Sequence, residues 1–367
     1  MNPAPAKFFE QITTLESLAR AHQIAMRGKK SNLSATSSNY RFMSQLLELQ
    51  AELISGRYYP LPYRHKIISE PKVRSIEAPA FRDRIVHHAI HQVLSPFYER
   101  FFIADSYACR KDKGTHKAMS RVQKFIRQQP HDYTCKIDIS KYYASINHTK
   151  LHQLLSKRLP EQKLLNLLAT IITSHQSGPE HDHLFPSDSP YHTKGSHGIP
   201  IGNLTSQLFA NVYLHELDMF VKQQLKIRHY VRYMDDILFF HPDKTQLRQW
   251  QQQITDFLHD ELYLTVNPRK VRIYPARLGV DFVGFVLYRS HRRVRASSVR
   301  RFRRRFHRQL KLLMDGKLTA EALEASLSAW TAHVAHGQGE GLVKAERQKL
   351  DDALFVVWVK QKLAEMT

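Results

Sequence analysis

Cysteine is scarce in this sequence, and long apolar runs are missing from it. Cys109 and Cys135 are its two cysteines and form no CxxC pair, which excludes a disulfide framework and a cysteine zinc site. The first residues lack a charged start followed by an apolar core, and no run approaches the roughly 18 apolar residues of a membrane-spanning helix. We therefore expect a cytoplasmic protein in a reducing setting, with no membrane partner.

Acidic residues are outnumbered by basic ones. The 367 residues include 33 Asp plus Glu against 55 Lys plus Arg, which gives a formal net charge of +22. A surplus of this size indicates a polyanionic partner, most simply nucleic acid, with a merely basic enzyme as the alternative. A hydrophobic content of 42% with 10% aromatic residues is typical of a folded chain.

Strands and helices are predicted in a mixed order. Helical spacing covers 8–26 and 37–54, and the alternating, proline-containing stretch 58–79 predicts a hairpin. Further helices are expected over 81–102, ended or kinked by Pro96, over an amphipathic 203–225 and over 247–262; further strands are expected over 133–140, 231–240 and 280–288. The order has no regular βαβ cadence, so the predicted class is α+β.

Two adjacent carboxylates stand out in the segment VRYMDDILFF, residues 231–240. Asp235 and Asp236 lie between two apolar runs, at the expected tip of a hairpin. One interpretation is a turn, which Asp favours through hydrogen bonds from the backbone to its own side chain. The other is a metal site, because adjacent like charges repel unless a cation holds them ionised, and carboxylate oxygens suit Mg²⁺.

A third acid lies in the segment CKIDISKYYASI. Asp138 ends an apolar strand, where capping of the following helix is the alternative role. Together with the hairpin acids and the basic composition, it completes the carboxylate set of two-metal nucleotidyl transfer. In that chemistry one ion lowers the pKa of a primer 3′-hydroxyl, and the other stabilises the triphosphate and the leaving pyrophosphate.

The ordered segments DISKYY, GIPIGNLTSQ, YMDD, NPRK and FVGF resemble palm motifs A to E of reverse transcriptases, within roughly residues 58–311. The resemblance implies a right-hand polymerase with an antiparallel palm sheet. It implies an N-terminal helical extension over 1–56, interleaved fingers and palm over 57–290, and a helical thumb and C-terminal end over 291–367. Asp138 and Asp235 would be catalytic and hold two Mg²⁺ ions, with Mn²⁺ as an alternative, and Asp236 would be a third carboxylate of the same site.

The resemblance also implies contacts to an incoming dNTP. Tyr143 occupies the position of an aromatic steric gate that collides with a ribose 2′-hydroxyl, whereas Tyr142 is interpreted as a core aromatic. Lys72 and Arg74 match the fingers hairpin whose cations hold the triphosphate.

Two further cations each have two alternative roles. Lys270 in NPRK resembles the lysine proposed to protonate pyrophosphate as it leaves, with a solvated surface lysine as the alternative. Arg84 either contacts the nucleotide or pairs with Asp83.

Eleven Arg and Lys residues and no acid lie from Arg289 to Lys311. Apolar residues recur through this segment at helical spacing, so it predicts an amphipathic helix with one cationic face. Such a face suits a thumb helix along the primer-template duplex, with a solvated or membrane-surface helix as the alternative. The predicted nucleic-acid contacts are Arg300, Arg301, Arg304, Arg305 and Arg308.

Motif B departs from the usual pattern. Most reverse transcriptases read QGxxxSP there, whereas this chain reads IGNLTSQ over 201–207, which is similar to the enzymes of diversity-generating retroelements. Ile201 would replace a hydrogen-bonding amide by an apolar contact and loosen the geometric check on the base. Gly202 would permit close approach of the backbone to the nucleotide. Gln207 belongs to the predicted substrate-binding set, although helix capping and packing also explain it.

This resemblance implies partners and a biological role. Such enzymes perform mutagenic retrohoming, in which a template RNA is copied from a primer into adenine-mutagenised cDNA, commonly with a small pentameric accessory variability protein. A template-repeat and variable-repeat pair beside an accessory gene would indicate this role. A defence island lacking them would indicate the alternative, an antiphage defence reverse transcriptase. A non-catalytic RNA-binding scaffold with a relict palm is a third possibility.

Two segments carry no chemistry that the sequence identifies. The stretch 175–197 is rich in His, Ser and Pro but matches no common zinc spacing, and it is predicted to be an irregular loop. The chain ends soon after the expected thumb, so template removal and integration are expected to require other proteins.

Overall fold

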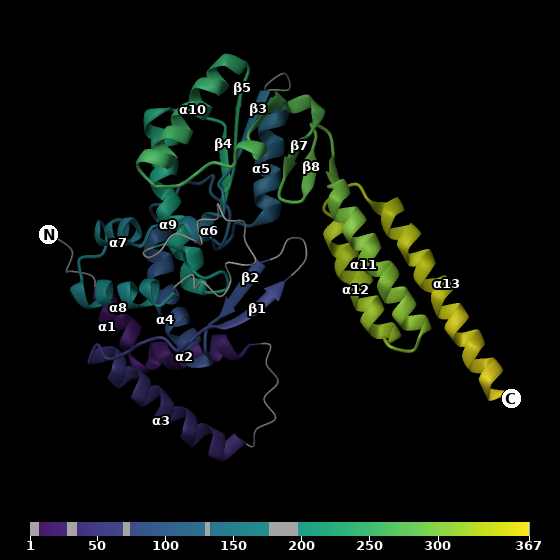
Figure 1. Cartoon of the computed structure of the whole chain (residues 1–367), viewed down its shortest axis with the longest axis horizontal. Coiled ribbons are helices and arrows are strands. Elements are labelled where there is room, and N and C mark those ends of the chain that lie inside the picture. The colour runs from purple at the N-terminus through teal and green to yellow at the C-terminus, as the bar shows by residue number, and fades with distance from the viewer. Residues whose placement is uncertain (1–6, 28–34, 69–73, 129–132, 176–196, 367) are drawn as a thin grey trace. The chain divides into compact units, whose positions relative to one another are not determined.

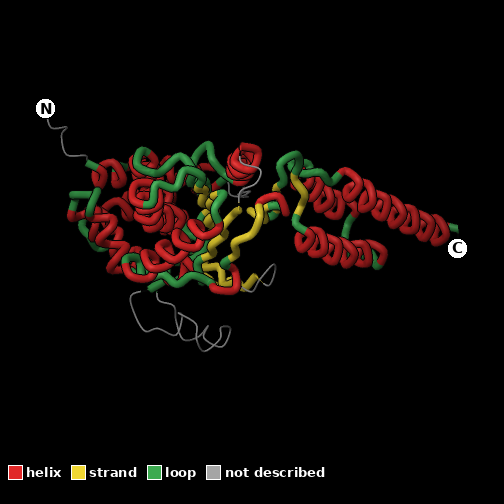
Figure 2. Tube along the Cα trace, turned by 90° about the horizontal axis from the view of Figure 1, so that it is seen from above, coloured by secondary structure: helices red, strands yellow, loops and turns green. Residues whose placement is uncertain are grey.

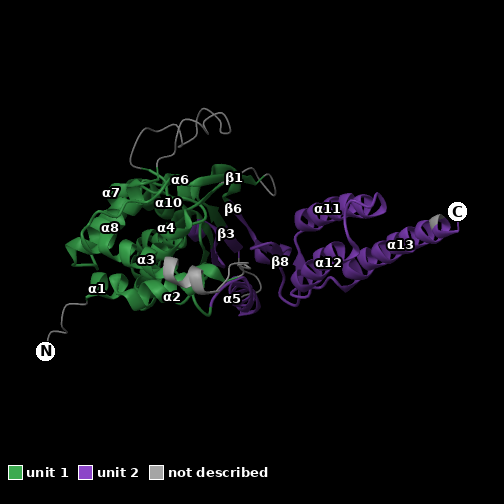
Figure 3. Cartoon of the chain, turned by 90° about the horizontal axis from the view of Figure 1, so that it is seen from below, with its two compact units in different colours: residues 1–112, 136–237, 248–271 green, residues 113–135, 238–247, 272–367 purple. Residues whose placement is uncertain are grey.

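The computed structural model describes residues 7–27, 35–68, 74–128, 133–175 and 197–366 (Figure 1). The chain divides into two compact units, which Figure 3 colours separately: unit 1 comprises 1–112, 136–237 and 248–271, and unit 2 comprises 113–135, 238–247 and 272–367. The class is α+β, as predicted, and Figure 2 shows that helices account for most of the trace. The division into an N-terminal extension, fingers and palm, and a thumb, with boundaries after residues 56 and 290, stays a prediction.

Unit 1 begins with two helices where one was predicted. They are α1 (Phe8–Thr13) and α2 (Leu15–Met26). Thr14 leaves helical geometry with ψ 144°, and its hydroxyl accepts a hydrogen bond from the Ser17 amide. Because this bond satisfies a free amide of the next turn, Thr14 begins a new helix and the prediction of a continuous 8–26 helix was wrong.

A residue distant in sequence caps α1. The carboxylate of Glu161, just before α8 (Gln162–Thr173), accepts hydrogen bonds from the amides of Phe8 and Phe9 at 2.7 and 3.0 Å. The first amides of a helix have no partner within it, and a negative charge suits that end of the helix dipole. The start of α1 is therefore tied to a residue 153 positions away in sequence.

Two longer helices and a hairpin complete the first part of unit 1. α3 (Ala35–Ile54) confirms the second predicted helix, and α4 (Phe81–Glu99) contacts α2 and α9 (Leu204–Met219). Pro96 lies inside α4 and does not end it. β1 (Arg64–Ile68) and β2 (Arg74–Ala78) pair antiparallel, which confirms the hairpin predicted within 58–79.

The helix α9 (Leu204–Met219) is buried on nearly every side. The prediction of an amphipathic helix over 203–225 was wrong, because α4 and α7 (His148–Ser156) both contact this helix and its polar Asn211 and Asp218 are themselves buried. It continues directly into the π-helix η3 (Phe220–Gln224).

Four strands form one sheet in the order β4-β5-β3-β6. They confirm the predicted hairpin and the strand before it, and their bounds are β3 (Tyr133–Asp138), β4 (Tyr230–Tyr233), β5 (Asp236–His241) and β6 (Arg272–Pro275). α5 (Thr115–Gln128) precedes β3 in sequence, and α6 (Tyr142–Ser145) and α7 (His148–Ser156) follow it. α10 (Lys244–Asp260) and η4 (Pro268–Lys270) lie between β5 and β6, and η5 (Ala276–Leu278) follows β6.

Unit 2 ends in three antiparallel strands and three helices. The strands are β7 (Val280–Phe282), β8 (Phe285–Leu287) and β9 (Arg292–Val294), and the helices are α11 (Ala296–Met314), α12 (Ala320–Val334) and α13 (Glu340–Glu365). The prediction of one strand over 280–288 was wrong, because Val283 and Gly284 both adopt positive φ and reverse the chain. The three helices contact one another, and Phe302 stacks on Trp330 with ring centroids 4.3 Å apart.

None of the described helices is both long and apolar enough to cross a membrane.

Candidate active site

The acidic hairpin tip is built on an uncommon turn. Between β4 and β5, Met234 has φ of 55°, a left-handed conformation that is rare for a residue with a side chain. Asp235 follows in the turn, and Asp236 begins β5. β5 pairs with β3, which ends at Asp138, so acids distant in sequence come together at the end of neighbouring strands.

Asp138 does not cap the helix that follows it. α6 begins at Tyr142, and its N-cap residue is Lys141, whose side chain makes no capping bond. The capping interpretation of Asp138 is therefore wrong, and its carboxylate is available to the site.

Two of the three carboxylates are paired with lysines. Lys270 Nζ lies 2.5 Å from Asp138 Oδ1, and Lys136 Nζ lies 3.0 Å from Asp236 Oδ1. Burial, and then the charge of Asp138, raise the pKa of the Asp235 carboxyl to about 6. A carboxyl in this environment gains from any cation that approaches it.

Two of the three acids have oxygen atoms that suit a hard divalent cation. Asp138 and Asp235 supply carboxylate oxygens, and the ammonium of Lys270 shows that a positive charge is accommodated on Asp138. Asp236 instead contacts Lys136 through both of its oxygens, at 3.0 and 3.2 Å. Within the described ranges, no group of three or more His, Cys, Asp and Glu side chains is arranged to hold a metal ion, so a three-carboxylate site stays a prediction.

We expect Asp235 to make the metal-free protein less stable as the pH rises from about 4 to about 6. Its pKa is near 3.9 in an unfolded chain and about 6 in the folded protein. The folded state binds this proton more tightly, so the associated stability is present at low pH and is lost as the pH rises through that window.

The measurement is the melting temperature of the parent and of Asp235→Asn across this range. The variant should gain stability relative to the parent on going from pH 4 to pH 7, and saturating Mg²⁺ should reduce the gain by stabilising the parent. A pH-independent difference between the two proteins would contradict the expectation.

Tyr143 lies beside the hairpin tip. Its hydroxyl is 3.8 Å from the sulfur of Met234, and burial raises the pKa of the phenol, so it stays protonated at neutral pH. Tyr142 is 2% exposed and donates a hydrogen bond to the carbonyl of Ala210 at 2.5 Å, which confirms it as a core aromatic.

The segment IGNLTSQ, residues 201–207, lies against the β1–β2 hairpin. The carbonyl of Ile201 accepts a hydrogen bond from the amide of Glu77 at 3.0 Å, and Gly202 has φ of 136°. Gly202, Gln207 and Arg84 line one cavity of about 300 Å³. The other lining residues are Ile76, Ala78, Pro79, His87, His88 and Leu204.

Gly202→Ala is expected to destabilise the protein by about 1–3 kcal/mol. A Cβ at this position would lie 2.7 Å from the carbonyl oxygen of Glu77, and φ of 136° is unfavourable for alanine. Thermal or urea denaturation measures the loss. Gly56→Ala is the matched control, because Gly56 has φ of 72° but open space around it. Equal losses for the two variants would show that the close approach to Glu77 contributes nothing.

The predicted triphosphate contacts, Lys72 and Arg74, lie largely outside the described residues. Lys72 is outside the described residues, and so is the side chain of Arg74, although Arg74 itself begins β2. Asp83 accepts a hydrogen bond from the hydroxyl of Tyr58 at 3.0 Å, while Arg84 lines the motif B cavity.

In unit 2, α11 separates an apolar face from a cationic one. The buried residues of this helix are Phe302, Phe306, Leu310 and Leu313. The five predicted nucleic-acid contacts are all exposed: Arg300, Arg301, Arg304, Arg305 and Arg308. The predicted amphipathic helix is confirmed, and its role in binding stays a prediction.

The His-rich segment lies mostly outside the described residues, which resume at 197. At its two ends, His175 Nδ1 lies 2.8 Å from Glu77 Oε2, and His197 Nε2 lies 3.2 Å from Asn147 Nδ2.

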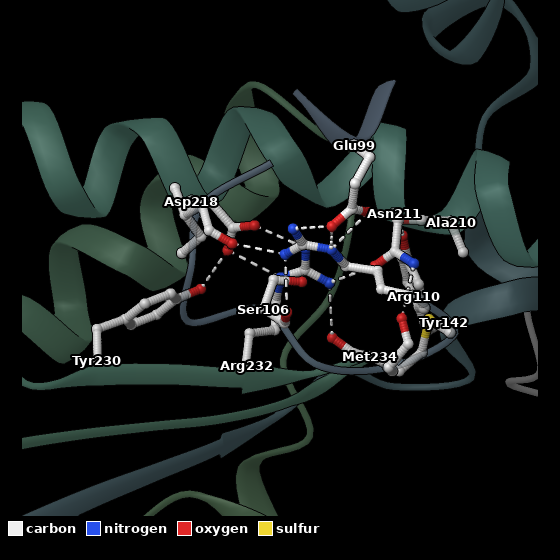
Figure 4. A network of polar contacts seen from close by, with 12 residues as sticks. Glu99, Ser106, Arg110, Tyr142, Ala210, Asn211, Asp218, Tyr230, Arg232 and Met234 are labelled. Carbon is white, nitrogen blue, oxygen red and sulfur yellow. Dashed lines mark hydrogen bonds and ion pairs between the residues drawn. The ribbon is translucent and has the colours of Figure 1, made fainter. Parts of the chain in front are cut away.

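Sequence reasoning missed two charged residues beside the acids. Lys136 precedes Asp138 by two positions on β3, so the two-residue period of a strand puts both on one face, and this signal was available. Arg232 of β4 makes a bidentate ion pair with Asp218 of α9 (Figure 4). No sequence pattern pairs residues on these two elements.

Comparisons with known proteins point to one family. A model described as reverse transcriptase (RNA-dependent DNA polymerase) matches residues 66–287. Protein YkfC of Escherichia coli (strain K12) is 26% identical over 326 residues, which cover 77% of this chain and 83% of YkfC. The group II intron-encoded protein LtrA of Lactococcus lactis subsp. cremoris is 28% identical over 174 residues, which cover 47% of this chain and 27% of LtrA.

A solved structure of telomerase from Candida albicans is also similar. Its sequence identity is 14% and the TM-score is 0.48, over 81% of this chain and 55% of the telomerase chain.

Proposed function

The chain belongs to the reverse transcriptase family of RNA-dependent DNA polymerases, and from this premise we propose that Asp138 and Asp235 hold the metal ions of its nucleotidyl transfer. The observation that carries the proposal is the placement of these two acids at the end of β3 and in the turn before its neighbouring strand β5, where the charge of Asp138 helps raise the pKa of Asp235 to about 6. Burial and repulsion disfavour two ionised carboxylates unless cations compensate them.

The side chains of the protein would bind the metal ions and donate a proton to the leaving group. When bound, Mg²⁺ or Mn²⁺ supplies a lowered pKa at the primer 3′-hydroxyl and neutralises charge on the triphosphate. Lys270 would donate a proton to the leaving pyrophosphate, and its ammonium lies 2.5 Å from Asp138. Asp236, paired with Lys136, would balance charge beside the site.

The substrates would be dNTPs, a template RNA and a primer that becomes cDNA. Tyr143 would exclude ribonucleotides, and its contact with Met234 beside Asp235 supports this role. Lys72 and Arg74 would bind the triphosphate. The exposed arginines of α11 would contact backbone phosphates, which position a duplex without reading its sequence.

We further propose that the enzyme is the error-prone polymerase of a diversity-generating retroelement. The support is motif B, where Ile201 and Gln207 occupy the positions of Gln and Pro in the usual QGxxxSP pattern. An aliphatic side chain at Ile201 makes no hydrogen bond to a base, so a mispaired geometry is penalised less. In this role an accessory variability protein would be a further partner.

Ile201→Gln is expected to lower misincorporation opposite template adenine by about tenfold, the effect of one hydrogen bond of about 1–1.5 kcal/mol. The measurement is primer extension on a template RNA of known sequence, with sequencing of the cDNA. Ile201→Leu is the matched control, because it keeps an apolar side chain and should keep the error frequency.

Equal error frequencies in Ile201→Gln and Ile201→Leu would show that the apolar side chain of Ile201 does not cause the misincorporation. Sequencing the nucleic acid that copurifies with the protein, before and after dNTPs are supplied, tests the biological role separately. A product related to one template region with adenine-directed changes is expected.

A further inference from the structure

Arg232 and Asp218 form a fully buried ion pair. Both side chains are 0% exposed, and the guanidinium is bidentate, with Nε 2.8 Å from Oδ1 and Nη2 2.6 Å from Oδ2 (Figure 4). The hydroxyl of Tyr230 donates a further hydrogen bond to Oδ1 at 2.8 Å. The carboxylate is thus satisfied by three donors from one strand.

One nitrogen of the Arg232 guanidinium, Nη1, does not contact Asp218. Replacing a buried ion pair by apolar residues is often neutral for stability, so stability alone is a weak reason for an arginine here. Its remaining nitrogen, Nη1, lies 3.3 Å from the carbonyl oxygen of Met234 and 3.3 Å from Oδ1 of Asn211. Lysine lacks the rigid fork that makes both sets of contacts at once.

The backbone of Met234 has an unfavourable conformation that its surroundings must stabilise. Its left-handed backbone is costly for a residue with a side chain and persists only when the surroundings over-determine it. Arg232 donates a hydrogen bond to the Met234 carbonyl, and the hydroxyl of Tyr143 lies against its sulfur. The carbonyl of Met234 belongs to the peptide that leads into Asp235.

The main chain at Arg232 is also held. Its amide donates to the carbonyl of Asp105, and its carbonyl accepts from the amide of Tyr107, both at 3.0 Å. The guanidinium therefore projects from a fixed backbone onto a fixed carboxylate, and its third nitrogen has a defined position.

We infer that Arg232 is a positioning residue, which, anchored on Asp218, fixes the peptide between Met234 and Asp235 and thereby orients the Asp235 carboxylate. This inference rests on the proposed metal-binding role of Asp235. Displacing this carboxylate by about 1 Å is expected to lower the reaction rate on the order of 10- to 100-fold. Residues that bind the nucleotide at other positions would be unaffected.

The first test is Arg232→Lys, assayed for dNTP incorporation by the full-length protein. We expect kcat to fall about 10- to 100-fold and the KM for dNTP to stay within about threefold. Tyr230→Phe is the matched control, because it removes a hydrogen bond to the same carboxylate without touching Met234. It should keep kcat within about twofold.

A second variant covers the case in which Arg232→Lys does not fold. Arg232→Met, Asp218→Leu and Tyr230→Phe combined replace the whole buried group by apolar residues of similar size, which should preserve folding. This combined variant should show the same loss of kcat, because the contact with Met234 is absent from it. A folded combined variant with the kcat of Tyr230→Phe would overturn the inference.

Hydrogen exchange gives a readout that does not depend on activity. The amides of Asp235 and Asp236 should exchange faster in Arg232→Lys, or in the combined variant, than in Tyr230→Phe. Unchanged exchange would overturn the inference even if kcat falls. If the parent protein incorporates no dNTP, the proposed function fails, and the exchange rates still decide whether Arg232 holds the turn.

Discussion

Asp235→Asn is expected to lower the rate of Mg²⁺-dependent dNTP incorporation by about 1,000-fold. A metal ion supplies several kcal/mol of charge stabilisation to the transition state, and a loss of about 4 kcal/mol corresponds to that factor. The amide keeps the size of the side chain but removes the charge that binds the ion. Single-turnover primer extension at saturating dNTP measures the effect.

Folding is not expected to account for this loss. Since burial and the Asp138 charge disfavour the ionised form of Asp235, its replacement by a neutral residue should leave the melting temperature at pH 7 unchanged or raised. An inactive Asp235→Asn with a lowered melting temperature would leave the two effects unseparated, whereas an active one would refute the proposed metal centre.

Asp236→Asn is the matched comparison. Asp236 is bound through both oxygens by Lys136, so we expect a loss of no more than about tenfold, typical of a hydrogen-bonded group outside the reacting set. A loss as large as that of Asp235→Asn would favour three metal-binding carboxylates, as the sequence predicts.

Tyr143→Ala is expected to reduce the preference for dNTP over rNTP by about 100-fold, the order of discrimination that shape alone provides against an added hydroxyl. The ring is held beside the acids by its contact with Met234, and alanine would leave room for a ribose 2′-hydroxyl. The ratio of kcat/KM for dCTP and CTP on one template measures the change.

The control for this prediction is Tyr143→Phe, which keeps the ring and removes the hydroxyl. It should retain the preference for dNTP, since the collision involves the ring. A preference that survives in Tyr143→Ala would assign the exclusion of ribonucleotides to another residue.

Local patterns in the sequence predict the strand ends that carry the acids. The run before Asp138 and the two apolar runs around Asp235 are short, bounded and β-branched or aromatic, and each forms a strand. The family resemblance then relates the three segments, which periodicity alone does not do. The cationic helix α11 is likewise predicted, because its apolar stripe is regular over several turns.

The errors arise where tertiary contacts override a local pattern. α9 has the spacing of an amphipathic helix, but neighbouring helices cover its polar side as well. Its polar residues are buried with partners such as Arg232, which comes from a strand that the sequence does not relate to them. Single residues that leave the local geometry, such as Thr14 with an extended backbone and Val283 with positive φ, also divide elements that periodicity treats as continuous.

The capping of α1 by Glu161 has a consequence for synthesis on the ribosome. A helix of six residues is too short to persist alone in water, and its first two amides find their acceptor only after residue 161 has emerged. In the nascent chain, the amides of Phe8 and Phe9 therefore lack this acceptor until some 150 further residues have been translated. The capping of α1 is therefore completed only as α8 begins to emerge.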